Sequence, residues 1–313
     1  MPDETPKYYR SIPLVPKRTE PVDRDTAHLV YNSTLHSGRV RGEFVARQPL
    51  HVGTGLLVAP QSLGLNDEAP LVKSFFRAGD RLTVPGSSLK GAVRHLVEAL
   101  TYSAVSKTRV RLDRELYGES QYDSRRGRGE LDPAGRIFGA MGYQGHVQFG
   151  DCPLLAGQSA IMDIPPQYEP RAGEGRRYYP HGLVDNRSPL WPLEVVEAGG
   201  RFAFEMRFNN LSAAELGVLL IAFGQSDPPI CLKLGAGKSS GLGAVRFDDV
   251  VAETWDPAVA YVAPDVAWTP LDKAACLAAV EQLLRRDETL RRLQADLGCA
   301  QLSKQPSVRG ESE

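Results

Sequence analysis

Apolar and charged residues alternate along residues 39–47, and this two-residue period predicts a β-strand with one buried face. Val40, Phe44 and Ala46 stand on the apolar side of the pattern, with charged residues between them. Shorter apolar or alternating runs, bounded by glycine, proline or polar residues, predict further extended segments. These lie at 49–55, 145–151, 194–196, 201–208, 230–234 and 243–247.

Three segments have the three-to-four-residue apolar spacing of an amphipathic or buried helix. The first follows a Pro-Gly turn at 85–86 and runs to about residue 102. The second spans about 212–223, where Ser212 and Glu215 form an S-x-x-E capping box. The third is charged, amphipathic and spans about 271–297.

The start of the first helix carries candidate chemistry. Ser87 or Ser88 is predicted to cap the helix, while Lys90 and Arg94 lie four residues apart on its polar side. Hydroxyl groups and cations at the positive end of a helix suit a phosphate group. The alternative interpretation is a well-capped helix that simply packs on a sheet.

Long irregular segments interrupt the pattern and divide the chain. Residues 1–37 are predicted to form an extended arm, 38–255 one domain, and 256–313 a helical tail. The domain contains three predicted insertions at about 56–81, 104–135 and 164–192. In the last of these, basic residues stand beside aromatic ones, a pairing that suits phosphate contact and base stacking. An ordered surface loop with its tyrosines packed on the body is the alternative.

The glycine-rich segment 235–243 contains Gly237-Lys238-Ser239, which resembles part of a nucleotide-binding P-loop. A P-loop also needs a glycine where Leu232 stands and a helix after the lysine, whereas a strand is predicted here. The pattern therefore excludes an NTPase loop. It predicts instead a glycine turn between strands, whose backbone amides and lysine approach a polyanion.

The composition of the chain excludes several classes of protein and of site. Lysine and arginine total 37 against 38 aspartate and glutamate, so a nucleic-acid site has to be a local patch. No apolar run reaches the ~20 residues that span a bilayer. The polar start of the chain has no signal-peptide pattern. Four scattered cysteines argue against a zinc site and fit a reducing compartment, so we expect a cytoplasmic protein without a membrane partner.

Candidate catalytic residues are few. Asp67 and Glu68 lie in the first insertion, where a loop acid can hold a divalent ion or accept a proton. His51 and His181 lie beside glycine turns and are candidate acid–base groups, although a lone histidine is more often structural.

The order of these motifs resembles the RAMP superfamily of CRISPR-associated proteins. The resemblance rests on Pro49-Leu-His-Val-Gly-Thr-Gly55, Pro85-Gly-Ser-Ser-Leu-Lys-Gly91, Arg136-Ile-Phe-Gly139 and the glycine segment 235–243, and it covers about 38–250. More narrowly, it is similar to backbone subunits of type III (Csm/Cmr-like) effector complexes. The resemblance implies an α+β fold with a modified ferredoxin-like (RRM-like) core and long insertions, one of them a thumb-like β-hairpin.

The resemblance also implies partners and roles. Partners would be a CRISPR guide RNA, a target RNA, other RAMP subunits and a large subunit. The residues implied in RNA binding are Ser87, Ser88, Lys90, Arg94, Arg136, Arg176, Arg177, Tyr178, Lys238, Ser239 and Ser240.

Target cleavage in such subunits uses a loop aspartate in an Asp-x-Pro-aliphatic pattern, with a divalent metal such as Mg²⁺. Here Glu68 stands two residues before Pro70 and Asp67 one place earlier. Either Asp67 serves as catalytic residue and metal ligand from a shifted loop, or the subunit does not cleave. Two other hypotheses are a metal-independent endoribonuclease that processes repeat RNA with His51 or His181 as base, and a non-catalytic cap subunit.

Overall fold

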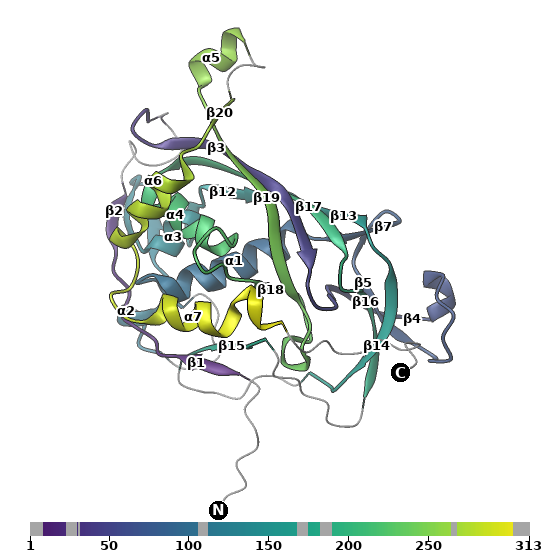
Figure 1. Cartoon of the computed structure of the whole chain (residues 1–313). Coiled ribbons are helices and arrows are strands. Elements are labelled where there is room, and N and C mark those ends of the chain that lie inside the picture. Colours follow the sequence, from purple (N-terminus) through teal and green to yellow (C-terminus); the bar gives the residue numbers. More distant parts are fainter. Residues whose placement is uncertain are drawn as a thin grey trace, which may run out of the picture.

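A long antiparallel sheet organises the chain in the computed structural model (Figure 1). The structure describes residues 9–22, 30, 32–105, 112–167, 175–181, 190–263 and 268–302. The strand order is β18 (Leu232–Lys233), β19 (Ala244–Trp255), β3 (His36–Ala46), β17 (Arg201–Leu211), β13 (Cys152–Ala156), β7 (Arg81–Val84) and β6 (Arg77–Ala78). In addition, β12 (Val147–Phe149) pairs with β17, and β20 (Trp268–Pro270) pairs with β19.

The alternating pattern of residues 39–47 is confirmed in β3, where Val40, Phe44 and Ala46 are buried. Phe44 stacks on Phe202 of β17 with ring centroids 5.0 Å apart, and it meets Phe247 of β19 edge-on. Such aromatic pairs across neighbouring strands stabilise the sheet beyond the area they bury. The three central strands are therefore held by one aromatic layer.

Helices α1 (Gly86–Leu100), α4 (Ala213–Ala222) and α6 (Lys273–Ala279) lie on one face of this sheet (Figure 1). The capping box of α4 is confirmed, because the Ser212 hydroxyl accepts from the Glu215 amide while the Glu215 carboxylate accepts from the Ser212 amide. The α+β class is confirmed as well. Along the chain, the central elements follow the order β3, α1, β12–β13, β17, α4, β19.

A second sheet has the order β14 (Ser159–Ile164), β16 (Trp191–Val196), β5 (Val72–Phe75) and β4 (Gly53–Val58). The prediction of a loop over 56–81 is therefore wrong. β4 and β5 form a hairpin, with the short turn of helix η1 (Pro60–Leu63) between them. The buried Glu194 carboxylate holds this region by accepting from the Phe75 amide at 2.8 Å and from both Arg77 guanidinium nitrogens.

Three small sheets tie the chain's outer segments to the body. β1 (Arg10–Ile12) pairs with β15 (Arg176–Tyr178), and β10 (Gly139–Ala140) with β11 (Tyr143–Gln144). β2 (Glu20–Val22) pairs with β9 (Arg128–Leu131), which pairs with β8 (Gln121–Asp123). Two short helices, α2 (Arg114–Tyr117) and α3 (Pro133–Phe138), complete this part.

The C-terminal helix predicted over 271–297 is broken in the structure. α6 is followed by η4 (Val280–Gln282), then by α7 (Thr289–Leu297) and η5 (Cys299–Gln301). Buried Arg285 lies in the break, where its amide donates to Leu100 O at 2.8 Å and its guanidinium to Ala99 O and Pro13 O. These bonds satisfy carbonyl groups at the end of α1, which a continuous helix could not reach.

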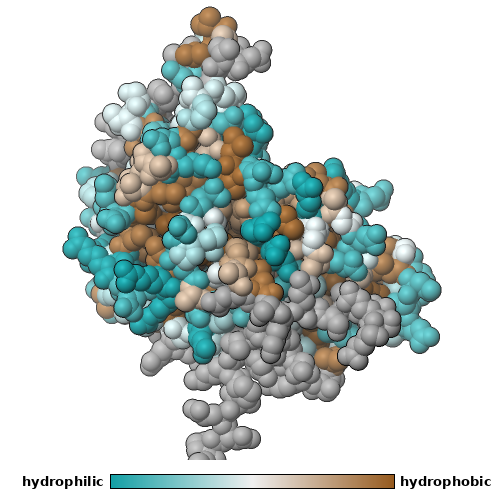
Figure 2. Space-filling model, in the orientation of Figure 1, coloured by the Kyte–Doolittle hydropathy of each residue, from teal (hydrophilic) through white to brown (hydrophobic). Residues whose placement is uncertain are grey.

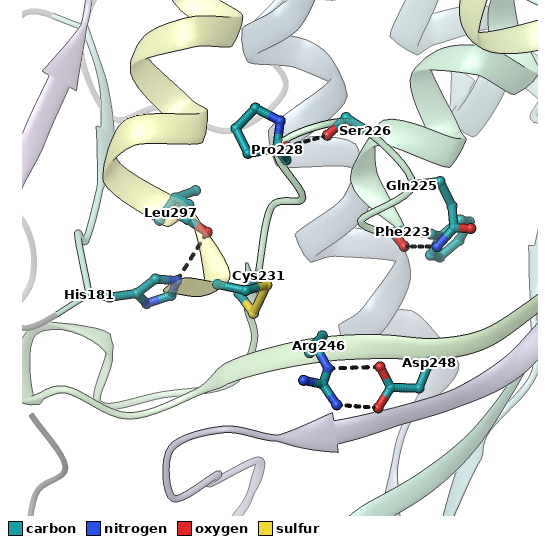
Figure 3. Close-up of a disulfide and its surroundings, with 10 residues drawn as sticks. His181, Phe223, Gln225, Ser226, Pro228, Cys231, Arg246, Asp248 and Leu297 are labelled. Carbon is teal, nitrogen blue, oxygen red and sulfur yellow. Dashed lines mark hydrogen bonds and ion pairs between the residues drawn. A yellow bond between two sulfur atoms is a disulfide. The ribbon is translucent and has the colours of Figure 1, made fainter. Parts of the chain in front are cut away.

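Cys231 and Cys299 form a disulfide with their Cα atoms 4.9 Å apart (Figure 3). The spacing of the cysteines along the chain did not indicate this pair. The disulfide also differs from what we expected, because cysteines stay as free thiols in a reducing compartment. The Cys231 amide also donates to Leu297 O at 2.8 Å, so the end of α7 lies beside the strand that leads to the glycine-rich segment. Among the described residues, no helix is long and apolar enough to cross a membrane.

Candidate nucleic-acid interface

The start of α1 differs from its prediction in one respect. The N-cap is Pro85, without a side-chain cap, so neither serine is the predicted cap and both lie in the first turn. Gly86 is needed for a close approach, because a Cβ there would lie 2.3 Å from Phe149 O. The Gly86 amide donates to the Asp151 carboxylate at 2.8 Å. Ser87 is left exposed and Ser88 half-buried.

A cavity of about 310 Å³ lies between the first turn of α1 and the strands β11 and β12. Its lining consists of Gly86, Ser87, Lys90, Gln144, Gly145, Val147, Gln148 and Phe149. Lys90 is half-buried, and burial, helped by Arg94, lowers the pKa of its ammonium group. Within the part of the chain that the structure describes, Lys90 has no carboxylate partner. A partly desolvated cation of this kind favours an anionic ligand.

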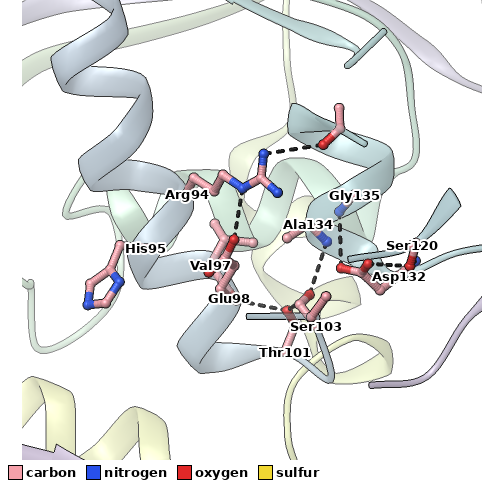
Figure 4. Close-up of polar contacts among 12 residues, drawn as sticks. Arg94, His95, Val97, Glu98, Thr101, Ser103, Ser120, Asp132, Ala134 and Gly135 are labelled. Carbon is pink, nitrogen blue, oxygen red and sulfur yellow. Dashed lines mark hydrogen bonds and ion pairs between the residues drawn. The ribbon is translucent and has the colours of Figure 1, made fainter. Parts of the chain in front are cut away.

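Arg94 is held inside the fold. Its Nε donates to the Glu98 carboxylate at 2.8 Å, and a terminal nitrogen donates to Gly139 O at 3.2 Å (Figure 4). The other Glu98 oxygen accepts from Arg176 at 2.7 Å, and Arg176 also donates to Ala104 O. Glu98 and Arg176 are both buried. This geometry assigns Arg94 and Arg176 a structural task in place of the predicted phosphate contact.

Arg136 and Tyr178 also form hydrogen bonds within the fold. The Arg136 guanidinium pairs with Glu215 and donates to Asn210 O at 3.0 Å. Tyr178 is buried, and its hydroxyl donates to His95 O at 2.9 Å. Burial raises the pKa of the Tyr178 hydroxyl, so it stays a neutral donor. Tyr178 is therefore absent from the surface, and the half-buried Arg136 guanidinium is engaged by partners within the fold.

Arg177 alternates with its two buried neighbours along β15 and is half-buried. Its guanidinium lies 4.5 Å from the centre of the Tyr9 ring. β15 pairs with the N-terminal β1, and the described residues of 164–192 contain no hairpin of their own. The predicted thumb also covers 168–174 and 182–189, which lie outside the described residues.

The glycine-rich segment forms the predicted turn between two strands, and the exclusion of a P-loop is confirmed because strand β19 follows it. Gly235, Gly237, Gly241 and Gly243 all have positive φ angles. At Gly235 a Cβ would also lie 2.1 Å from His51 O, so only glycine fits there.

Within this turn, the single-turn helix η2 (Lys238–Ser240) presents the polar residues. The Lys238 ammonium donates to Gly235 O, and burial lowers its pKa to about 8. The Ser239 hydroxyl donates to Gln167 at 3.2 Å, whereas Ser240 is buried. Burial and the charge of Arg176 lower the pKa of His95 in α1 to about 4, and Lys238 adds a smaller contribution.

Asp67 and Glu68 lie between η1 and β5, near the tip of the β4–β5 hairpin. The Asp67 carboxylate accepts from the Ala69 amide at 2.7 Å, while Glu68 is exposed. Among the described residues, no three His, Cys, Asp or Glu side chains converge as a metal site requires. Two neighbouring acids do not by themselves fit a bound Mg²⁺.

His51 and His181 are both buried, with 4% and 6% of their surface exposed. His51 Nδ1 bonds to Glu194 O at 2.5 Å, and His181 Nε2 to Leu297 O at 3.2 Å. Burial lowers the pKa of both rings, to about 4 for His181. An RNA strand cannot reach either imidazole in this arrangement, which disfavours the repeat-processing hypothesis.

Sequence reasoning missed Gln144, Gln148 and Lys233. The two glutamines line the cavity, and Lys233 is a buried lysine whose ammonium donates to Gln48 at 2.7 Å and to Leu242 O at 3.0 Å. Burial, helped by Lys238, lowers the pKa of Lys233 to about 7. No local pattern marks these residues. Their environments form only where α1 packs against β12 and where β18 pairs with β19.

These observations define an α+β protein with helices on one face of an antiparallel sheet and a glycine-rich turn between strands β18 and β19. A family model of the RAMP superfamily matches residues 43–246, more than half of the chain. The chain therefore belongs to the RAMP superfamily, as its motifs predicted.

One similar solved structure is described as the type III-B Cmr-beta bound to cognate target RNA, from cryo-electron microscopy. The identity is 15% and the TM-score 0.40, with 69% of this chain and 61% of the other covered. This chain thus spans less than two thirds of that structure's chain. A search of curated proteins finds no match.

Proposed function

We propose that this protein is a guide-RNA-binding backbone subunit of a type III CRISPR effector complex, which acts in antiviral defence in the cytoplasm. Membership of the RAMP superfamily supports this. So does the succession of central elements, which is the βαββαβ order of a ferredoxin-like core. The observation that carries the proposal is Lys90, a half-buried cation for which the described residues provide no carboxylate partner, at the edge of the cavity.

In this proposal, Ser87, Ser88 and Lys90 on α1 hold phosphates of the guide, and Lys238 and Ser239 on the glycine-rich turn hold others. Contacts of this kind grip the RNA backbone without reading its sequence. Arg177 remains a candidate contact. Arg94, Arg136, Arg176, Tyr178 and Ser240 serve instead to position the two RNA-binding elements, since each is buried or bonded within the fold.

Replacing Lys90 and Lys238 together by alanine should weaken RNA binding and lower the slope of log affinity against log salt by about 1–2, because each lost phosphate contact removes nearly one released counterion. Fluorescence anisotropy of a labelled single-stranded RNA over a salt series measures both quantities. Burial lowers the pKa of Lys238 to about 8, so the wild-type affinity should also fall as pH rises past that value.

The matched control replaces Lys17 and Lys273 by alanine. Like Lys238, both of these lysines donate to a backbone carbonyl, Gly118 O and Val250 O, and the net charge changes by the same amount. This control should keep the wild-type slope. If the wild type, the Lys90 and Lys238 variant and the control all had the same salt slope, Lys90 and Lys238 would face solvent in the complex. The proposal would then lose its main support.

Other subunits are the expected protein partners, including further RAMP subunits and a large subunit. The strand pair β19–β20 ends in a projecting short helix, α5 (Pro257–Val262), which stands clear of the body (Figures 1 and 2). Tyr261 is 93% exposed and Val262 82% exposed. Side chains of this kind favour a partner surface that covers them.

Replacing Tyr261 and Val262 by serine should reduce incorporation of the subunit into the complex while its thermal midpoint stays unchanged, because these side chains make few contacts within the chain. Native mass spectrometry of co-expressed subunits measures the incorporation. Serine substitution of exposed Leu155 provides the control, since it lies in β13, a different strand from the β19–β20 pair that carries this tip. Normal assembly of the double variant would exclude α5 as a contact.

A further inference from the structure

One face of the second sheet ends in an exposed tryptophan. Side chains alternate along β16, so Trp191, Leu193 and Val195 lie on the same face of the sheet. Leu193 and Val195 are buried in a small hydrophobic cluster, to which Leu242 of the glycine-rich turn also belongs. Trp191, at the start of the strand, is 46% exposed. Its indole ring therefore borders solvent where the packed part of this face ends.

The glycine-rich turn lies beside the strand pair that carries this tryptophan. Ile164 of β14 pairs with Trp191, and residues paired in this way have Cβ atoms about 5 Å apart. A Cβ at Gly237 would lie 3.4 Å from Ile164 Cδ1. The Ser239 hydroxyl donates to Gln167, three residues after Ile164. The element that holds phosphates in our proposal is thus a near neighbour of the indole ring.

Lys73 of β5 lies over the same ring. Its ammonium group is 5.1 Å from the centre of the Trp191 ring, and Lys73 is itself exposed, so this face of the ring opens to solvent. The described residues provide Lys73 with no carboxylate partner. An exposed cation–π contact is weaker than the stacking of a base on an aromatic ring, so a base can displace the ammonium group. The flexible lysine side chain then remains beside the displacing group.

The combination of these groups is typical of a site for single-stranded nucleic acid. Such sites place an aromatic ring, on which a base stacks, beside cations that follow the phosphates. The aromatic residue that the sequence implied in RNA binding, Tyr178, is buried and cannot stack on a base. Trp191 has the exposure that Tyr178 lacks, and Lys73 supplies the cation.

We propose that Trp191 stacks on one base of the RNA strand whose phosphates the glycine-rich turn holds, with Lys73 on the phosphate beside that base. The inference rests on the proposed function of the chain as an RNA-binding subunit. It adds a contact to a base without a preference for one sequence, because every base has a π face.

Replacing Trp191 by alanine should weaken binding of a labelled single-stranded RNA by about tenfold, the effect of one lost stacking contact. The slope of log affinity against log salt should keep its wild-type value, because this ring neutralises no phosphate. Trp191→Leu should lose as much affinity, whereas Trp191→Phe, which keeps an aromatic ring, should retain most of it. Lys73→Ala should instead lower the salt slope by about 1. Fluorescence anisotropy over a salt series measures affinity and slope.

Two controls isolate the contact with a base. Trp255→Ala removes another tryptophan, which is 39% exposed at the end of β19 that is distant from the glycine-rich turn, and it should bind RNA as the wild type does. An abasic strand of the same length keeps the phosphates and lacks the bases, so the wild type and Trp191→Ala should bind it equally. The thermal midpoint of each variant checks its folding.

Two results would overturn the stacking contact. The first is wild-type RNA affinity in both Trp191→Ala and Trp191→Leu; if these variants then assembled poorly into the complex, Trp191 would be a contact with another subunit. The second is an equal loss of affinity for the normal and the abasic strand, which would show that the ring acts only through the fold of the chain.

The lysine variants separate this inference from the function on which it rests. If Lys90 and Lys238 determine the salt slope but the Trp191 variants bind RNA normally, the RNA-binding function stands and the stacking contact is wrong. If the Trp191 variants lose affinity while the salt slope does not depend on Lys90 and Lys238, the base contact stands and the proposed phosphate-binding elements are wrong.

Discussion

Replacing Glu98 by alanine should lower the free energy of unfolding by about 3–5 kcal/mol, the cost of removing one partner of a buried ion pair. Glu98 is 3% exposed and accepts from Arg94 at 2.8 Å and from Arg176 at 2.7 Å. Without the carboxylate, the buried Arg176 guanidinium loses the charge that offsets its desolvation. Urea unfolding followed by circular dichroism measures the change.

Glu288→Ala is the matched control for this experiment. Glu288 also pairs with an arginine one helical turn away, Arg292, but both side chains are more than half exposed and the nearest atoms are 3.8 Å apart. An exposed pair contributes about 0–1 kcal/mol, so this variant should unfold nearly as the wild type does. A similar small loss in Glu98→Ala would contradict the buried network that joins α1 to β15.

If this subunit supplies the target-cleaving acids, as the family resemblance implies, replacing Asp67 and Glu68 together by alanine in the assembled complex should abolish periodic cleavage of the target RNA and leave guide binding intact. The two acids lie near the tip of the β4–β5 hairpin, on a different element from the α1 start and the glycine-rich turn that hold the guide in our proposal. The bond from the Ala69 amide to the Asp67 carboxylate holds this side chain in a defined turn, whereas Glu68 is exposed. Product lengths on a denaturing gel measure the cleavage.

Asp123→Ala provides the control for the cleavage experiment. Asp123 is another exposed turn aspartate, which accepts from the Arg125 and Arg126 amides in a similar way. Its removal should leave the cleavage pattern unchanged. Cleavage that persists in the Asp67 and Glu68 double variant would assign the activity to another subunit. The two single variants identify which acid is required.

The central sheet and its helices could be predicted because their apolar residues follow the period of a strand or a helix. β3, α1, α4 and the strands that flank the glycine-rich turn all belong to this group. The β4–β5 hairpin could not, since its exposed Leu56 and Leu57 do not alternate with polar residues in the usual way. The C-terminal helix was predicted as one element because its break at Arg285 serves a contact with α1, which is distant in the sequence.

The residues of the candidate site also fall into two groups, those that local sequence motifs identify and those whose role depends on distant parts of the chain. Lys90 and Lys238 were identified from local motifs, a helix start and a glycine turn, and both motifs form in the structure. Arg94, Arg136 and Arg176 belong to the same motifs or to a basic loop, but each meets a carboxylate or a carbonyl from another part of the chain. A sequence lists the charges without their partners, so it cannot separate a free cation from a paired one.

By itself, the sequence determined the family, the α+β class and the two local motifs, because spacing and glycine positions constrain nearby backbone. The tertiary structure decided which cations remain available to a ligand, since burial and pairing depend on residues brought from 78 positions away, as for Glu98 and Arg176. It also decided that a cavity lies beside Lys90. That cavity exists because Gly86 allows α1 to approach β12, a contact between segments that are not adjacent in the chain.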